Sequence, residues 1–371
     1  MKDNDHKNIL ICPLSWGTGH ATRVQVVAWE LKKRGHKIII AAPPSLHKTF
    51  DTRVYDKIVS LWSPTVSYSK FLPPYLAVLL QLPVMLTAFI SDRLSLPRLI
   101  RIYGIDLVIS DNRFGMWSHK AYSVYITHQL RVAVPRAFTF AGPLVSAIHR
   151  SVARRYNECW IPDLPGLDNL SGMLSHDCRL PPATRYTGIL SRFSKQADPS
   201  LFSVDRENVQ GSGFLSSQYT LALLSGPEPQ RRIFENLIIL LKDRLPGSLV
   251  IVAGKPGDEK ENKDDAVLRY PWLDGLSLYM LMKNARLIIC RPGYSTIMDL
   301  FTLGRTALLV PTPGQPEQEY LADYLSGKYG FNTIKQKQLE GEFSIPDTGK
   351  GLIWKGDERL LDKALDDLLR K

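Results

Sequence analysis

One histidine and one aspartate in the first half of the chain occupy positions suited to acid–base chemistry. His20 follows a Gly-Thr-Gly turn and opens a helix predicted over residues 21–34. Asp111 directly follows an apolar strand predicted over residues 106–110. If both elements belong to one parallel sheet, both side chains lie at its carboxyl edge. A histidine oriented by a carboxylate can act as a general base, although a histidine making only local hydrogen bonds is the simpler alternative.

Glycine turns that precede helix starts recur in the second half of the chain. Ser225-Gly226 and Gly254 each follow a predicted strand, and Arg291-Pro292-Gly293 precedes a predicted helix that begins with Ser295 and Thr296. Backbone N–H groups at helix starts bind anions, and glycine lets the backbone approach a ligand closely. Several such turns at one sheet edge indicate a site for a diphosphate.

Three side chains near these turns are suited to hydroxyl groups. Asp299 lies two turns into the helix that begins at Ser295, where its carboxylate could accept hydrogen bonds from a ribose. Gln318 and Glu319 begin the following helix and could hold sugar hydroxyls. The simpler alternatives are an exposed helix residue for Asp299 and a partner of the helix dipole for Glu319.

Strands and helices alternate twice along the chain, which predicts two doubly wound parallel sheets. Residues 1–190 form the first predicted domain, with a last helix over residues 358–370 packed on it. Residues 191–213 are polar, contain Gly, Ser and Pro, and are predicted to link it to a second domain over residues 214–355. Doubly wound sheets bind ligands outside the carboxyl ends of their strands.

The two halves differ in charge. Residues 1–190 contain 23 Lys and Arg against 12 Asp and Glu, whereas residues 191–371 contain 24 of each. A basic half predicts an anionic partner. No zinc-finger spacing, RNP-like aromatic pattern or helix-turn-helix signal is present, so an anionic membrane surface is favoured over nucleic acid. A basic surface that serves only solubility is the plain alternative.

Residues 71–90 carry no charged side chain, a length that could span a bilayer. Three prolines, Pro73, Pro74 and Pro83, interrupt the run, which favours a buried or interfacial segment over a span. Arg93, Arg98 and Arg101 follow it. An apolar stretch beside basic residues is typical of peripheral binding to anionic lipid, and an ordinary pair of core helices is the alternative.

The chain resembles the MurG-like group of GT-B glycosyltransferases, glycosyltransferase family 28. Its members carry a GTGGH loop, which Gly17, Thr18, Gly19 and His20 match with one glycine fewer. The best match is the segment 290–299, CRPGYSTIMD, which is similar to the family's Arg-x-Gly turn, Thr and ribose-binding Glu. Asp299 takes the place of that Glu. Gln318 and Glu319 match the family's Gln-rich sugar loop, with Glu in the place of one Gln.

The resemblance implies a GT-B fold, two Rossmann-like domains facing a cleft, and an inverting transfer of a sugar from a UDP-sugar. N-acetylglucosamine is the expected sugar, and a lipid-linked or membrane-associated acceptor the expected partner. Gly293 would approach the diphosphate, Asp299 would hold the ribose, and the loop from Gln315 to Glu319 would read the sugar. The loop from Gly17 to His20, with His128, would face the acceptor.

No metal and no cofactor beyond the donor substrate is expected, because no DxD-type metal motif stands at a strand end. The four cysteines, without paired or metal-ligand spacing, and the polar N-terminus predict a cytoplasmic protein. The basic half and the apolar run beside arginines add a peripheral location on the inner face of the membrane. Three alternatives stay open. They are a soluble glycosyltransferase of a small natural product, a UDP-GlcNAc 2-epimerase, and a non-catalytic sugar-nucleotide-binding protein.

Overall fold

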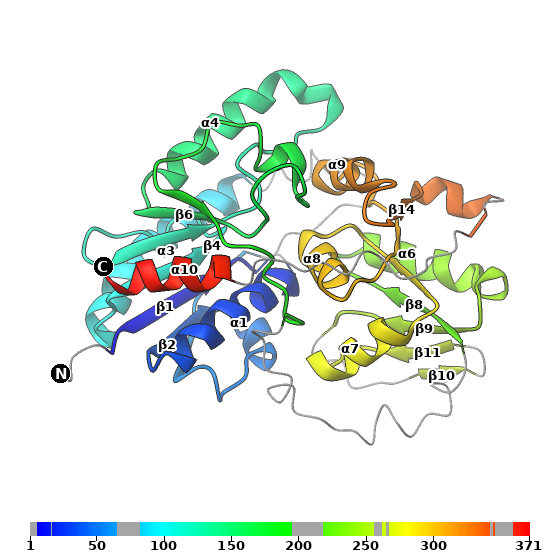
Figure 1. The fold of residues 1–371 in the computed structure, drawn as a ribbon, viewed down its shortest axis with the longest axis horizontal. Helices are drawn as coiled ribbons and strands as arrows, with labels where there is room; N and C mark the ends of the chain where they lie inside the picture. Colours follow the sequence, from blue (N-terminus) through cyan, green and yellow to red (C-terminus); the bar gives the residue numbers. More distant parts are fainter. Residues whose placement is uncertain are drawn as a thin grey trace. The chain divides into compact units, whose positions relative to one another are not determined.

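The structure, a computed structural model, describes residues 6–15, 17–64, 82–194, 218–255, 262–264, 267–341, 344–345 and 359–371. The chain divides into two compact units. The first unit runs to Ser191 and also takes in the C-terminal helix, and the second unit begins at Arg192. Each unit contains a twisted sheet of seven strands with helices packed against it (Figure 1). The predicted fold class, α/β with two doubly wound parallel sheets, is confirmed.

The first sheet is parallel throughout and has the strand order β3-β2-β1-β4-β5-β6-β7. Its strands are β1 Asn8–Pro13, β2 Lys37–Ala42, β3 Lys57–Ser60, β4 Leu107–Asp111, β5 Tyr122–Ile126, β6 Glu158–Ile161 and β7 Thr184–Tyr186. The α-helices of this unit are α1 Thr18–Lys33, α3 Leu82–Tyr103, α4 Gly142–Ala153 and α10 Arg359–Leu369. Short 3-10 helices are η1 Pro44–Thr49, η2 Arg136–Ala141 and η3 Gly172–Leu174.

The second sheet has the order β10-β11-β9-β8-β12-β13-β14, and only the β10–β11 pair is antiparallel. Its strands are β8 Tyr219–Leu223, β9 Ser248–Val252, β10 Asn262–Asp264, β11 Val267–Tyr270, β12 Leu287–Cys290, β13 Leu308–Leu309 and β14 Asn332–Thr333. The helices are α6 Gln230–Leu240, α7 Gly275–Asn284, α8 Tyr294–Thr302 and α9 Pro316–Leu325, with η6 Lys242–Arg244 and η7 Gln336–Glu340.

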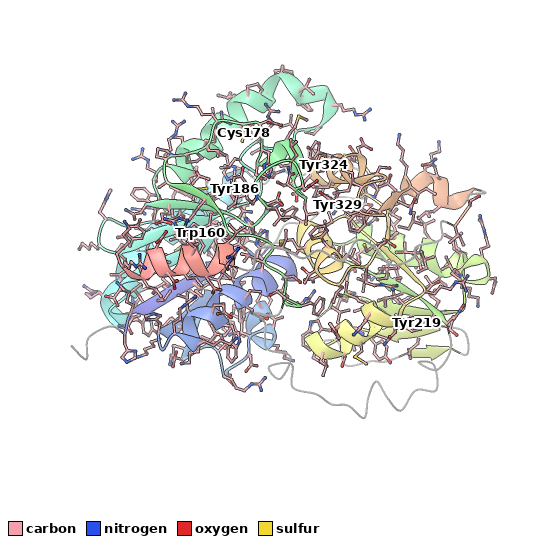
Figure 2. The ribbon with its side chains drawn as sticks, in the orientation of Figure 1. Trp160, Cys178, Tyr186, Tyr219, Tyr324 and Tyr329 are labelled. Carbon is pink, nitrogen blue, oxygen red and sulfur yellow. The ribbon has the colours of Figure 1, made fainter. Side chains whose placement is uncertain are left out.

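The strands are nearly continuous apolar runs because helices cover the sheet. The central residues of β1, β2 and β4 are fully buried. Two large polar aromatic side chains in the cores have hydrogen-bond partners, as buried polar groups require. The indole of Trp160 in β6 donates to Glu158 over 2.8 Å, and the hydroxyl of Tyr219 in β8 donates to the carbonyl of Leu281 over 2.8 Å; both side chains are labelled in Figure 2.

The C-terminal helix α10 is held to the first unit by ion pairs. Arg34, after α1, lies 2.8 Å from Asp362, and Arg185 in β7 lies 2.7 Å from Asp367. An apolar stripe, with Leu361, Leu365 and Leu368, is buried. The chain therefore returns to its first unit after completing its second.

Helix α3 differs from the expectation for the uncharged run of residues 71–90. Residues 71–81 lie outside the described residues, and the remainder forms the first part of this helix of 22 residues. Pro97 stands inside α3. A prediction that ends helices at proline therefore gives too short a length for this helix. Val84, Leu86 and Ile90 are exposed, so this part of the run is not core. Within the described part of the chain, no helix is both long and apolar enough to cross a bilayer.

Candidate active site

The carboxyl edge of the first sheet brings together His20, Arg23, Asp111 and His128. Asp111 ends β4, His128 follows β5, and His20 and Arg23 lie one turn apart in the first part of α1. These elements are neighbours because β1, which leads into α1, pairs with β4, and β4 pairs with β5. The sequence predicted that His20 and Asp111 would meet, and the structure places His20 Nδ1 3.2 Å from Asp111 Oδ1.

Arg23 is the residue that sequence reasoning missed. Its guanidinium is buried, donates from Nε to Asp111 Oδ2 over 2.9 Å, and makes a second hydrogen bond to Asp111 Oδ1 through Nη2. It also lies 2.9 Å from His20 Nδ1 and 3.2 Å from His128 Nδ1. The signal was available, because residues three apart share a helix face and Arg23 is three residues after His20.

Burial raises the pKa of the Asp111 carboxyl, but the charges of Arg23 and His20 outweigh that effect and hold the pKa at about 2. Asp111 is therefore a carboxylate at neutral pH. Neutral His20 can take either of two tautomers here, because its Nδ1 lies close to both Asp111 and Arg23. With the proton on Nδ1, His20 donates to Asp111 and keeps Nε2 as a base. With the proton on Nε2, the basic nitrogen is Nδ1, which accepts from Arg23 and so is not available to a substrate.

The turn before α1 has the geometry expected of a ligand loop. Gly17 is the N-cap of α1 with φ of +100°, a conformation that favours glycine. It has no side chain to accept hydrogen bonds from the first helical turn, which begins with Thr18 and Gly19. No acidic side chain stands in that turn. The assignment of Gly17, Thr18, Gly19 and His128 to acceptor binding remains a prediction.

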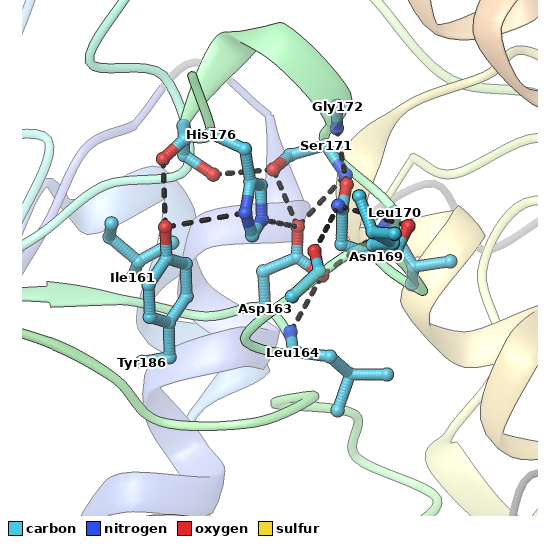
Figure 3. Close-up of polar contacts among 12 residues, drawn as sticks. Ile161, Asp163, Leu164, Asn169, Leu170, Ser171, Gly172, His176 and Tyr186 are labelled. Carbon is cyan, nitrogen blue, oxygen red and sulfur yellow. Dashed lines mark hydrogen bonds and ion pairs between the residues drawn. The ribbon is translucent and has the colours of Figure 1, made fainter. Parts of the chain in front are cut away.

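A second polar cluster lies at the same edge, after β6, and is shown in Figure 3. The buried Asp163 accepts hydrogen bonds from the backbone N–H groups of Leu164, Leu170 and Ser171 at 2.8–3.0 Å, and lies 3.2 Å from His176 Nε2. Tyr186 stacks on the His176 ring. A single carboxylate thus fixes the loop that follows β6. Its position directly after a buried strand and Pro162 was a signal that the sequence analysis did not use.

In the second unit, the predicted glycine turns lie at the ends of neighbouring strands. Gly226 follows β8 and Gly254 follows β9, which pairs with it. Gly254 has φ of +65°, and a Cβ there would come within 2.7 Å of the Leu224 carbonyl oxygen. Glycine is therefore required where the two loops touch. Ser225 and Gly226 are exposed.

The N-terminus of α6 already receives a carboxylate. Glu228 accepts a hydrogen bond from the Arg232 N–H over 3.3 Å, pairs with Arg231, and lies 3.3 Å from the Lys255 ammonium. Burial raises the pKa of Glu228, but Arg231 and Lys255 outweigh it and the pKa is lowered. This helix start is thus occupied by the chain's own anion.

Arg291 differs from the expectation that it lies beside the diphosphate. Its guanidinium is buried in the second unit, where it donates to the Val310 carbonyl over 3.0 Å and to Gln336 over 2.6 Å, and stacks on Phe234 at 3.9 Å. Burial lowers its pKa to about 9. The side chain turns inward because the interior offers it carbonyl oxygens and an aromatic face. Gly293 is the N-cap of α8, and Ser295 and Thr296 lie in the first turn of that helix. Gly293 has no side chain to cap the turn.

Asp299 is also more enclosed than expected. It is buried in α8, where Oδ2 accepts a hydrogen bond from Arg192 Nε over 2.9 Å and forms an ion pair with Arg192 Nη2 at 2.8 Å. We expected Asp299 to line an open site, but the structure places it in a buried ion pair. A ribose-binding role for Asp299 stays a prediction.

The sugar-loop residues fold back onto their own loop. Gln318 Oε1 accepts from the Thr312 N–H over 2.9 Å, and Glu319 Oε1 accepts from the Gly314 N–H over 2.8 Å. Gln315 is the N-cap of α9, and its Oε1 is buried without a hydrogen-bond partner. One acceptor of each long side chain shapes the loop, which leaves the amide nitrogen of Gln318 and the second carboxylate oxygen of Glu319 for other partners.

Comparison with known proteins finds a family likeness in the second unit. Residues 237–350 match the model of the glycosyltransferase family 28 C-terminal domain. The second unit carries a glycosyltransferase domain. The prediction of a glycosyltransferase-class enzyme is thereby confirmed, whereas the narrower MurG-like identity is not established by this match.

A relative from Caldanaerobacter subterraneus subsp. tengcongensis is 28% identical over 142 residues. It is a UDP-N-acetylglucosamine--N-acetylmuramyl-(pentapeptide) pyrophosphoryl-undecaprenol N-acetylglucosamine transferase. The match covers 35% of this chain and spans only 38% of the length of that enzyme.

Two solved glycosyltransferase structures have a similar fold. The spinosyn rhamnosyltransferase SpnG has a TM-score of 0.60 at 14% identity, covering 99% of this chain and 92% of its own. SnogD from Streptomyces nogalater has a TM-score of 0.57 at 14% identity, covering 98% and 94%. At such identity these likenesses establish the GT-B fold and do not assign a substrate.

Proposed function

We propose that this protein is an inverting glycosyltransferase that moves a sugar from a UDP-sugar to a membrane-associated acceptor. The observation that carries the proposal is that the two units contain different kinds of polar site. The edge of the first sheet holds a histidine against a buried carboxylate, 3.2 Å apart, and the second unit carries a family 28 domain with glycine turns at its strand ends. One half is suited to proton transfer and the other to binding a nucleotide sugar.

The proposed reaction uses His20 as the base. In the tautomer that donates from Nδ1 to Asp111, His20 Nε2 takes the proton of the acceptor hydroxyl. The hydroxyl oxygen forms a bond to the anomeric carbon as the bond from that carbon to the diphosphate breaks. Negative charge then develops on the departing UDP. The start of α8, from Gly293 to Thr296, stabilises that charge with backbone N–H groups and hydroxyls.

N-acetylglucosamine is the proposed sugar and a lipid-linked molecule the proposed acceptor. Support comes from the relative in Caldanaerobacter, whose name states both, and from the excess positive charge of residues 1–190. The Glu319 carboxylate in the sugar loop leaves the choice of sugar to experiment. We place the protein on the inner face of the cytoplasmic membrane on the same grounds.

A soluble natural-product glycosyltransferase is the second candidate, favoured by the fold neighbours SpnG and SnogD. One assay separates the two. UDP release from a panel of UDP-sugars is measured without acceptor, with membrane lipid extract, and with a panel of soluble aglycones. Stimulation by lipid extract supports the first proposal. Stimulation by aglycones alone moves the second candidate ahead, and no release from any UDP-sugar rejects both.

A further inference from the structure

Helix α4 of the first unit has its polar and apolar faces reversed. A helix on a protein surface normally buries an apolar stripe and exposes polar side chains. In α4 the buried side chains are Ser146, His149 and Ala153, whereas Leu144 and Ile148 are 65% and 59% exposed. Figure 1 shows α4 at the margin of the first unit, separated from α1 and α10.

The buried face of α4 is fixed by hydrogen bonds, so the helix cannot simply rotate its apolar face inward. Ser146 Oγ accepts from the Val132 N–H over 3.0 Å, and His149 Nε2 lies 2.8 Å from the Tyr125 hydroxyl. Rotation would break these bonds and leave buried polar groups without partners, which is costly. The outward apolar face is therefore a stable feature of the fold.

The exposed apolar surface continues into η2, directly before α4. Phe140 is 79% exposed and Phe138 is also exposed. We call the five side chains the η2–α4 surface: Phe138, Phe140, Leu144, Val145 and Ile148. Contiguous apolar patches of this kind mark interaction sites on soluble domains.

The charges carried by the stretch of sequence that contains the η2–α4 surface have one sign only. Between Asp111 and Glu158 the sequence has seven Lys and Arg and no acidic residue. Arg136 precedes the surface, Arg154 and Arg155 follow it, and all three are exposed. Apolar side chains flanked by arginines are the composition of helices that lie in the headgroup region of a membrane and bind anionic lipid.

We propose that the η2–α4 surface docks into an anionic lipid bilayer, with its apolar side chains inserted and the flanking arginines at the headgroups. This refines the membrane part of the proposed function and assigns it to a segment other than residues 71–90. Two other partners fit less well. A second copy would set this basic surface against itself, and nucleic acid would use the arginines but not the apolar side chains.

The test is co-sedimentation of the full-length protein with vesicles of phosphatidylcholine, or of phosphatidylcholine with about one-third phosphatidylglycerol, at low and high salt. The wild type is expected to bind the anionic vesicles, more weakly at high salt. Phe140→Ser/Leu144→Ser/Ile148→Ser should lower the partition coefficient by about tenfold or more, since three inserted side chains are lost. Arg154→Gln/Arg155→Gln should remove mainly the salt-sensitive part.

A matched control is available in the second unit, where Leu240 is also 79% exposed and Ile233 and Ile239 are exposed beside it in α6. Ile233→Ser/Ile239→Ser/Leu240→Ser should bind vesicles as the wild type does. Equal binding by the η2–α4 triple variant and the wild type overturns the proposal. The proposal is also overturned if the wild type is a dimer in sedimentation velocity and only the η2–α4 triple variant abolishes that dimer. The surface is then an interface between copies.

The docking surface and the enzymatic function can fail separately. UDP affinity, measured by calorimetry without lipid, should be the same in the wild type and the η2–α4 triple variant. If vesicle binding follows the surface but no UDP-sugar is turned over, the surface stands and the enzymatic proposal falls. If sugar is transferred to a soluble acceptor and the wild type ignores anionic vesicles, the docking proposal falls and the enzymatic one stands.

Discussion

The two units have the same architecture but equip their strand ends differently. At the first edge, charged side chains meet one another in the interior, with Arg23 contacting Asp111, His20 and His128. At the second edge, the loops are shaped by backbone contacts, as at Gly254, and long polar side chains fold back on them, as Gln318 and Glu319 do. The first edge thus concentrates titratable side chains, whereas the second edge presents loops shaped by backbone contacts; this difference agrees with the proton transfer and the donor binding that we propose for the two edges.

The strongest expected effect comes from breaking the buried ion pair of the first edge. Arg23→Met leaves Asp111 buried without its main cation, and we expect a loss of about 3–5 kcal/mol in the free energy of unfolding. Urea denaturation measures it. Arg232→Met, at an exposed position of the second unit, is the control and should change stability little. A loss in Arg23→Met no larger than in the control would show that the contact has little energetic weight.

Acid should also act on this pair. The pKa of Asp111 is held at about 2, below that of an unfolded aspartate, so its stabilising effect is complete above about pH 4 and is lost as pH falls toward 2. Urea denaturation of the wild type should show this decline. Asp111→Asn removes the titrating group, so its unfolding free energy should fall less steeply over the same range. Parallel curves for the two proteins would contradict the assignment.

For the proton-transfer role, the expected loss is smaller in energy but specific to turnover. His20→Ala should lower the turnover of UDP-sugar by about 100-fold or more, as for loss of a general base, and leave UDP affinity nearly unchanged. Asp111→Asn should give a smaller loss of the same kind. If His20→Ala turns over at the wild-type rate, the base is elsewhere, and His128 is the next residue to replace.

At the second edge, Asp299→Ala should weaken UDP binding by about 1–3 kcal/mol through the loss of ribose hydrogen bonds. The same change leaves Arg192 without its carboxylate, so thermal stability should fall as well. Arg192→Gln is the control, because it breaks the ion pair but keeps the carboxylate. Calorimetry in which Asp299→Ala binds UDP as tightly as Arg192→Gln would remove Asp299 from the nucleotide site.

The smallest expected effect concerns the sugar loop. Glu319→Gln keeps an oxygen that can accept from the Gly314 N–H, so the loop should persist, while the charge offered to the sugar is removed. We expect UDP affinity to stay the same and the ratio of rates among UDP-sugars to shift by a few-fold. Steady-state rates with each donor measure it. Unchanged ratios would show that Glu319 serves only the loop.

Much of the fold could be predicted from the sequence because strands buried on both faces are continuous apolar runs. The apolar strand predicted over residues 106–110 is β4, Leu107–Asp111. The short strands β3, β7 and β14, and the pair β10–β11, lie toward the sheet edges and have no such run, so they were not foreseen. Helix α3 was missed because Pro83 was read as an interruption of the uncharged run, whereas it lies in the first turn of the helix, where proline is tolerated.

The site could be predicted where it depends on strand ends and not where it depends on side-chain direction. The meeting of His20 with Asp111 followed from topology alone. The inward turn of Arg291 and the pairing of Asp299 with Arg192 depend on which interior partners are within reach, and no local pattern records that. The reversed faces of α4 were missed for a related reason, since periodicity shows that a helix has two faces but not which one is buried.

The most direct test of the central claim is the rate of UDP release from UDP-N-acetylglucosamine, with and without membrane lipid extract, in the wild type and in His20→Ala. Lipid extract should accelerate release by the wild type, and His20→Ala should be slower by about 100-fold or more in its presence. The claim would be contradicted if His20→Ala released UDP as fast as the wild type. It would also be contradicted if the wild type released no UDP from any UDP-sugar under any condition.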